Sequence, residues 1–207
     1  MQDRQSMCRS QYHQWTTRCV LILTALLTLG ITNRADNSHP SQIRLLDLEG
    51  RSVEPLNAPQ AKAVVLIFTR TDCPISNRYA PEVRRLAQKF AASGINFWLV
   101  YPDAEESVKE IRQHVKEYAY NFGALRDPQH RLVKLTGVSV TPEAAIFVTG
   151  GKMVYRGRID DRYLAFGKMR PAPTTHDLEQ VIGAILQGKS VVTRTNSAIG
   201  CFISDVK

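Results

Sequence analysis

The cysteine at position 73 is the residue whose type and neighbours most directly suggest chemistry. Cys73 opens the segment Cys-Pro-Ile-Ser at 73–76, which follows an apolar run at 63–68 and precedes a segment with helical spacing of charged and apolar residues. A thiol between a buried strand and a helix start lies near free backbone N–H groups and the positive end of the helix dipole, and both stabilise a thiolate. The sequence therefore predicts a reactive cysteine.

The motif contains a single thiol, because Ser76 stands where a dithiol motif has its second cysteine. We expect the Ser76 hydroxyl to donate a hydrogen bond to the sulfur of Cys73. A mixed disulfide at Cys73 cannot be resolved inside this motif, so the second thiol comes from another molecule or from Cys201. We predict Cys73 as the nucleophile and Cys201 as its resolving residue. In the alternative, Cys73 is an inert buried side chain and Cys201 pairs with another chain.

The remaining pattern predicts alternating strands and helices. Thr141-Pro142 opens one of the strand-like runs, and this pair is either a plain turn or part of a site. The expected strands are a hairpin at 43–48 and 51–56, then 63–68, 95–100, 124–126, 144–148 and 152–158. The expected helices are 77–93, where Pro81 predicts a kink or a late start, then 105–120, a turn at 130–136, and 177–186. Such an order is typical of an α/β fold.

The first 35 residues differ from the rest. Three arginines precede an apolar stretch at 20–31, which is shorter than the about 20 residues that span a membrane. This arrangement is typical of an export signal, either cleaved or kept as a membrane anchor. We divide the chain into a leader (1–35), a linker (36–42), a domain (43–188) and an irregular tail (189–207) that contains Cys201.

Composition narrows the classes of partner. With 207 residues, 43% of them hydrophobic, the chain has enough apolar material for one folded domain. The net charge is +8, of which the leader contributes +3, and the other basic residues are scattered among acidic ones. This pattern argues against a nucleic-acid partner. None of the five histidines has metal-ligand spacing to another, and no organic cofactor is implied.

A thiol at the start of the first long helix, a proline opening a hairpin and a closing helix together resemble the thioredoxin superfamily. Within it, the chain is similar to the redoxin and peroxiredoxin-like group of AhpC/TSA type. The similar segments are Tyr-Arg-Gly-Arg-Ile-Asp-Asp-Arg at 155–162 and Ala-Ile-Gly-Cys-Phe-Ile at 198–203, and the resemblance covers 43–203. It implies a thioredoxin-like fold, in which a central mixed β-sheet is flanked by helices, with an N-terminal β-hairpin extension. It also implies that Thr141 and a cis Pro142 pack beside Cys73.

The chain departs from its relatives at several positions. The peroxide-binding motif Pro-x-x-x-Thr-x-x-Cys of peroxiredoxins has Leu66 and Arg70 at its proline and threonine positions. Exported copper chaperones with this fold use Cys-x-x-x-Cys and a distant histidine, whereas here Asn77 stands at the second cysteine position.

We therefore expect an exported or membrane-tethered thiol oxidoreductase that acts in the periplasm or elsewhere outside the cytoplasm. Its substrate is a protein disulfide or thiol, or a small peroxide, and an external thiol reductant restores it. The tether would be the apolar stretch at 20–31. The rival interpretation is a thioredoxin scaffold that has lost turnover and binds a partner protein or a metal such as copper.

Overall fold

The structure is a computed structural model that describes residues 42–191 and 193–204. The predicted leader at 1–35 lies outside the described residues. No helix within the described ranges is long and apolar enough to cross a lipid bilayer.

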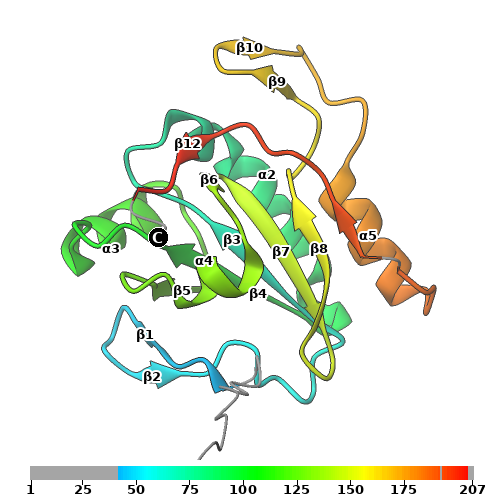
Figure 1. Cartoon of the computed structure of the whole chain (residues 1–207), viewed down its shortest axis with the longest axis horizontal. Helices are drawn as coiled ribbons and strands as arrows, with labels where there is room; N and C mark the ends of the chain where they lie inside the picture. Colours follow the sequence, from blue (N-terminus) through cyan, green and yellow to red (C-terminus); the bar gives the residue numbers. More distant parts are fainter. Residues whose placement is uncertain (1–41, 192, 205–207) are drawn as a thin grey trace, which may run out of the picture. The chain divides into compact units, whose positions relative to one another are not determined.

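Strands and helices alternate along the chain (Figure 1). The strands are β1 (Leu45–Asp47), β2 (Ser52–Val53), β3 (Ala63–Phe68), β4 (Ile95–Tyr101), β5 (Gly123–Arg126), β6 (Val140–Thr141), β7 (Glu143–Val148), β8 (Lys152–Gly157), β9 (Tyr163–Ala165), β10 (Lys168–Met169), β11 (Arg194–Thr195) and β12 (Cys201–Phe202). The helices are α2 (Pro74–Phe90), the 3-10 turn η2 (Ala91–Ser93), α3 (Val108–Glu117), α4 (Arg131–Thr136) and α5 (Asp177–Leu186).

Eight of the strands form one mixed sheet in the order β11-β8-β7-β3-β4-β5-β1-β2. Strands β3, β4 and β5 are parallel neighbours, while β7 runs antiparallel to β3 and β1 antiparallel to β5. The central mixed sheet and the N-terminal hairpin are both confirmed. The hairpin strands are shorter than predicted, because the pairing extends only over the residues next to the turn.

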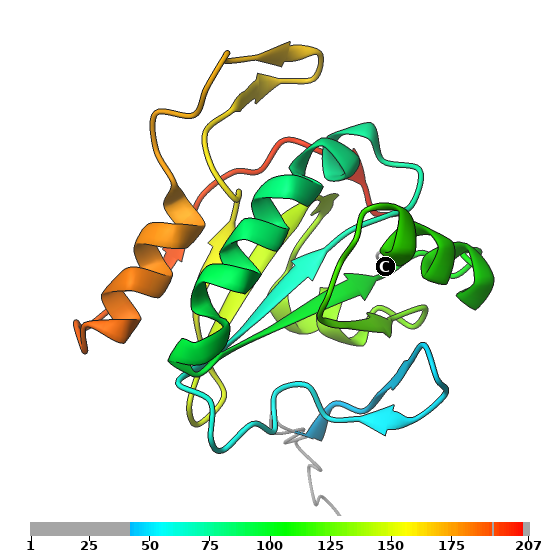
Figure 2. The same ribbon diagram turned by 180° about the vertical axis from the view of Figure 1, so that it is seen from behind.

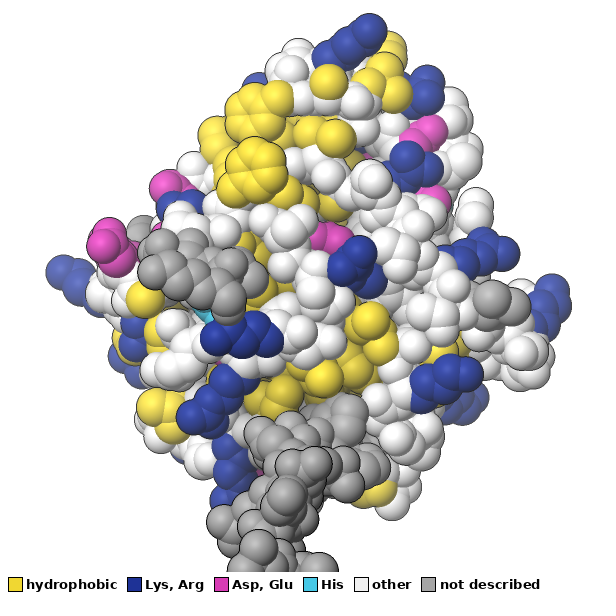
Figure 3. Space-filling view, viewed as in Figure 1, with side chains coloured by type: hydrophobic (Ala, Val, Ile, Leu, Met, Phe, Trp, Pro, Cys, Tyr) yellow, Lys and Arg dark blue, Asp and Glu magenta, His cyan; other side chains and the backbone are white. Residues whose placement is uncertain are grey.

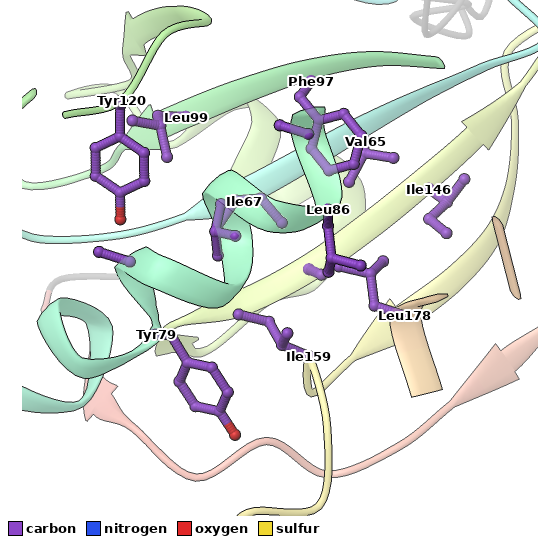
Figure 4. Packing of buried hydrophobic residues seen from close by; sticks show 14 of the residues in the cluster. Val65, Ile67, Tyr79, Leu86, Phe97, Leu99, Tyr120, Ile146, Ile159 and Leu178 are labelled. Carbon is purple, nitrogen blue, oxygen red and sulfur yellow. The ribbon is translucent and has the colours of Figure 1, made fainter. Parts of the chain in front are cut away.

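The central strand β3 is buried on both faces, as its unbroken apolar sequence predicts. Val65 and Ile67 pack in a cluster with Leu86 of α2 and Leu178 of α5 (Figure 4). On the opposite face Leu66 and Phe68 pack with Leu132 and Val133 of α4. Helices α2 and α5 therefore cover one face of the sheet, as Figure 2 shows, and α4 covers the other.

Helix α2 begins three residues earlier than predicted. Pro74 occupies its first turn, where the missing N–H of proline costs nothing, and Cys73 precedes it as the N-cap residue. The helix runs through Pro81, so the predicted late start is wrong. It ends at Phe90, followed by η2 and Gly94 with φ of 79°.

Helix α3 is shorter than the predicted 105–120. Ser107 caps its start, and its side chain and that of Glu110 bond reciprocally to the backbone of the first turn. This capping box fixes the first helical residue at Val108, three residues after the predicted start.

The C-terminal tail contains two short strands in place of a wholly irregular segment. Strand β11 adds to the sheet edge beside β8, and the amide of Asn196 donates to the carbonyl of Arg156 at 3.1 Å. Gly157, with φ of 153°, permits this approach, since a Cβ there would lie 2.4 Å from the Asn196 carbonyl oxygen. The tail then returns over the sheet, and β12 pairs with β6 (Figure 1).

Candidate active site

Cys73 lies in the turn between the carboxyl end of β3 and the start of α2. Its backbone is extended, with φ of −82° and ψ of 109°, and its sulfur accepts a hydrogen bond from the Ser76 amide at 3.5 Å. The predicted placement of a thiol at the N-terminus of the first long helix is confirmed.

The peptide bond between Thr141 and Pro142 is cis. The carbonyl oxygen of Thr141 lies 3.0 Å from the sulfur of Cys73, which donates to it when protonated. Both residues therefore lie where the resemblance placed them. Their contribution to catalysis stays a prediction.

Cys201 reaches the same point from the far end of the chain. Strand β12 runs antiparallel to β6 with Cys201 directly opposite Thr141, and the Cys201 and Cys73 sulfurs lie 2.7 Å apart. The structure records both as free thiols. Two cysteines separated by 128 residues in sequence are thus neighbours, as a nucleophile and its resolving residue must be.

Strand β12 covers the sulfur of Cys73. The Cys73 side chain has 0% exposure, whereas Cys201 is partly exposed. The predicted reactivity of Cys73 requires access to its sulfur, and this arrangement does not provide that access. Gly200 makes the cover tight, because a Cβ at this position would lie 2.2 Å from the carbonyl oxygen of Thr141. Strand β12 must therefore move away before a substrate can contact Cys73.

Ser76 contributes differently from the expectation. Its side chain is buried, and its hydroxyl oxygen has no hydrogen-bond partner among the described residues. The predicted hydroxyl bond to the sulfur of Cys73 is therefore not formed, and the Ser76 backbone amide donates instead. The first turn of α2 aims this amide at the sulfur, since an N-cap side chain accepts from the third residue after it.

The two thiols have opposite pKa shifts. Burial by itself would raise the pKa of Cys73, but hydrogen bonding from Cys201 and Ser76 outweighs it and holds this pKa below its ordinary value. Burial and the adjacent Cys73 sulfur raise the pKa of Cys201 to about 12. Cys73 is therefore the sulfur that ionises more readily, and the protonated Cys201 thiol donates a hydrogen bond to the Cys73 thiolate.

A partly buried hydrogen-bond network fixes the turn before Cys73. The Asn77 side chain donates to the carbonyl of Thr71, and the Asn77 backbone N–H donates to the carbonyl of Cys73, both at 3.0 Å. The Asn77 amide oxygen in turn lies 2.8 Å from Nε2 of His114, and Nδ1 of that ring lies 2.8 Å from the hydroxyl of Tyr101. We assign the proton of His114 to Nε2, because Tyr101 donates to Nδ1. Burial lowers the pKa of His114 to about 4, so the ring is neutral.

Glu106 supports the same turn from the loop after β4. Its carboxylate accepts a hydrogen bond from the amide of Thr71 at 2.6 Å, and burial raises its pKa. Its second oxygen has no partner among the described residues. Nearby, Arg70 forms ion pairs with Asp72 at 3.1 Å and Asp103 at 3.0 Å.

The supporting roles of Asn77, Glu106 and His114 were not predicted from the sequence. One signal pointed to His114, which comes three residues after Ile111 and so shares the helix face that the apolar pattern assigns to the core. Glu106 gave no such signal, because it lies in a loop 35 residues away from Thr71 in sequence.

One group of possible metal ligands lies elsewhere. Single ligand atoms of Glu82, Asp160 and His176 fall within 4.8 Å of one another. Both carboxylates already have partners, however, since Arg85 pairs with Glu82 at 2.7 Å and the Tyr79 hydroxyl donates to Asp160 at 2.5 Å. Within the described part of the chain, no His, Asp or Glu joins the two sulfurs in such a group.

A thiol capping the first long helix, a cis-proline loop against its sulfur and a mixed sheet between helices together define a thioredoxin-fold thiol protein. The comparison with protein families makes the assignment narrower. The AhpC/TSA family model matches residues 37–157, more than half of the chain, and the protein belongs to this family.

Individual relatives agree with that assignment. Thiol-disulfide oxidoreductase ResA from Bacillus thuringiensis is 28% identical over 108 residues, which are 52% of this chain and 61% of the relative. The chain thus matches less than two thirds of that relative's length. Among solved structures, a hypothetical protein from Sinorhizobium meliloti has a TM-score of 0.68 and 26% identity, covering 78% of this chain and 89% of that one. An uncharacterized conserved protein from Geobacillus kaustophilus has a TM-score of 0.67 and 25% identity, covering 78% and 87%.

Replacement of Gly200 by alanine should uncover Cys73. The added Cβ would collide with the Thr141 carbonyl, so β12 cannot remain seated, and we expect alkylation of Cys73 by iodoacetamide to become faster by about tenfold or more. The matched control is Gly183→Ala in α5, where an added Cβ meets no atom within 4 Å. Equal rates in Gly200→Ala and the unaltered protein would show that β12 does not restrict access.

Replacement of Cys201 by alanine should raise the pKa of Cys73. The thiol of Cys201 donates to the Cys73 thiolate, so its removal favours the protonated form and shifts the alkylation profile of Cys73 toward higher pH. Cys201→Ser keeps a donor at this position and should retain more of the lowered pKa. The measurement is the alkylation rate of Cys73 against pH in both variants, and identical profiles would contradict the assigned proton donor.

Proposed function

We propose that this protein is a thiol–disulfide oxidoreductase in which Cys73 is the nucleophile and Cys201 the resolving residue. The observation that supports this most strongly is the contact between the two sulfurs at the cis-proline loop, where one pKa is lowered and the other raised. Membership of the AhpC/TSA family and the similarity to a relative named as a thiol-disulfide oxidoreductase favour the same chemistry.

The reaction has two exchange steps. In the first, β12 moves aside and the Cys73 thiolate attacks one sulfur of a partner disulfide, so that a mixed disulfide forms and the other partner sulfur leaves as a thiolate. In the second, the sulfur of Cys201 loses its proton to that thiolate and attacks Cys73. The Cys73–Cys201 disulfide then forms and the partner leaves with both sulfurs reduced. Two electrons pass from the protein to the partner, and an external dithiol returns them.

The chemistry of the pair explains why Cys201 acts second. Part of its raised pKa comes from the hydrogen bond and the charge of the adjacent Cys73 sulfur. Once Cys73 is bound in a mixed disulfide it carries no charge, so this contribution disappears and the pKa of Cys201 falls. Cys201 thus becomes a nucleophile only after the first step.

Disulfide exchange is favoured over peroxide reduction by the residues around Cys73. Leu66, at the proline position of the peroxide motif, is a fully buried core residue of β3. Arg70, at the threonine position, has its guanidinium held by two aspartates. Neither residue supplies the hydroxyl donor that the peroxide motif places there.

Replacement of Cys201 by serine should trap the intermediate. We expect the reduced Cys201→Ser variant to form a lasting mixed disulfide with oxidised glutathione at Cys73, with turnover reduced by about tenfold or more, because the intramolecular attack is lost. The unaltered protein should instead yield a Cys73–Cys201 disulfide within one chain, as read from a non-reducing peptide map.

Parallel reactions with hydrogen peroxide separate the rival functions. A larger second-order rate constant for peroxide than for glutathione disulfide would contradict disulfide exchange as the main reaction and favour peroxide reduction. Absence of both reactions in the unaltered protein and in Gly200→Ala would favour the binding scaffold.

We also propose that the protein acts outside the cytoplasm, with residues 20–31 as its export signal or anchor. Support comes from the arginines before this apolar stretch and from the persistence of disulfides in oxidising compartments. The double substitution Leu26→Arg and Leu27→Arg should keep the chain in the cytoplasm of a Gram-negative host, because two charges abolish the apolar run. Cell fractionation measures this, and unchanged export would contradict the assignment.

A further inference from the structure

A cleft of about 630 Å³ opens between the β1–β2 hairpin, α3 and the segment from β5 to α4. Its apolar wall includes Leu46 and Val108, and its lining includes Arg112, Arg126 and Arg131. None of its lining residues belongs to the candidate active site, so its chemistry needs a separate explanation.

The three arginines have no acidic partner among the described residues. Each guanidinium donates a hydrogen bond to a backbone carbonyl, which carries no net charge to neutralise it. The pairs are Arg112 with Leu48, Arg126 with Glu106 at 2.8 Å, and Arg131 with Arg44 at 3.2 Å. Because a guanidinium has five N–H donors, each arginine keeps donors available for a ligand.

The acidic residues of the cleft offset only part of this positive charge. Asp47 and Glu49 both pair with Arg51, at 2.6 and 3.2 Å. The fourth arginine of the lining, Arg44, pairs with Glu54 at 2.6 Å. Because Arg51 cannot neutralise both Asp47 and Glu49, the lining residues together with Arg51 and Glu54 have a net charge of +2. The positive charge that no acidic side chain pairs with comes from Arg112, Arg126 and Arg131.

An exposed apolar side chain lies next to this charge. In the β1–β5 ladder Leu46 is directly opposite Arg126, and Leu46 is 54% exposed. Figure 3 shows Lys and Arg side chains gathered over this part of the molecule, where β1 and β5 lie in Figure 1. The cleft thus presents guanidinium groups and hydrocarbon side by side.

We propose that this cleft binds a phosphate-bearing ligand with an apolar part. The guanidinium fork fits phosphate oxygens in pairs, and the net positive charge of the cleft favours an anionic ligand with several acceptor oxygens. The apolar wall formed by Leu46 and Val108 would contact the non-polar part of the ligand. The cleft volume falls within the range of small-molecule sites, roughly 300 to 1,000 Å³.

Two sources offer this chemistry, a soluble phosphate ester and the headgroup of an anionic phospholipid. Calorimetric titration of the full chain with phenyl phosphate and with inorganic phosphate at low salt tests the shared chemistry. Phenyl phosphate should bind more tightly than inorganic phosphate, because only it contacts the apolar wall.

A second titration uses vesicles of phosphatidylglycerol or of phosphatidylcholine. Binding of phosphatidylglycerol vesicles alone assigns the ligand to the membrane, and binding of phenyl phosphate alone assigns it to solution.

The decisive variant is the double substitution Arg112→Gln and Arg131→Gln, which should weaken binding by about tenfold or more, since two charge-assisted hydrogen bonds are lost. Lys152→Gln with Lys189→Gln removes the same charge from exposed positions outside the cleft and should leave affinity unchanged.

A folding control accompanies the arginine variant, because both side chains also hold carbonyls of the hairpin segment. Arg112→Lys with Arg131→Lys retains the charge and should bind more tightly than the glutamine pair at equal thermal stability. The proposal is overturned if the unaltered protein binds neither phenyl phosphate nor phosphatidylglycerol vesicles. It is also overturned if Lys152→Gln with Lys189→Gln loses as much affinity as Arg112→Gln with Arg131→Gln. Equal affinities of the Arg→Lys and Arg→Gln double variants would overturn it as well.

Discussion

The antiparallel contact between β12 and β6 is the interaction on which the candidate site depends. It places Cys201 opposite Thr141 and thereby brings its sulfur against Cys73, which the turn between β3 and α2 holds from the other side. The same contact supplies a hydrogen-bond donor to the Cys73 thiolate and hides that sulfur from solvent. Ionisation of Cys73 and access to it are thus coupled through one strand of two residues.

The two sides of the candidate site differ in how firmly they are held. The turn before Cys73 is fixed by Asn77, His114 and Glu106, whose partly buried hydrogen bonds keep the Cys73 sulfur in one place. On the other side, β12 is held mainly by its short ladder, by the Ile203 amide bond to Ser139 at 3.0 Å, and by the burial of Ile203. A fixed sulfur under a weakly held strand suits the proposed exchange, in which β12 first moves away from Cys73 and Cys201 then returns to it.

Much of this arrangement could be predicted from local sequence. The buried strand β3 follows from its unbroken apolar run, helix α5 has the predicted bounds, and the position of Cys73 follows from the junction between an apolar run and a helix. The pairing of β12 with β6 could not be predicted, because strands of two residues leave no periodic pattern and these two strands lie far apart in sequence. Helix α2 starts three residues before the predicted position because Pro74 fits the first turn of a helix, where its missing N–H removes no hydrogen bond.

The sequence separation of the two thiols has a consequence for the whole molecule. A bond between Cys73 and Cys201 closes a loop that contains β4, β5, β7 and β8, so every core strand after β3 lies inside it. Closing a loop of more than a hundred residues restricts the unfolded chain by the equivalent of about 5 kcal/mol. The oxidised protein would then have the higher free energy of unfolding. In the proposed reaction the same fold would alternate between a more stable disulfide form and a less stable dithiol form.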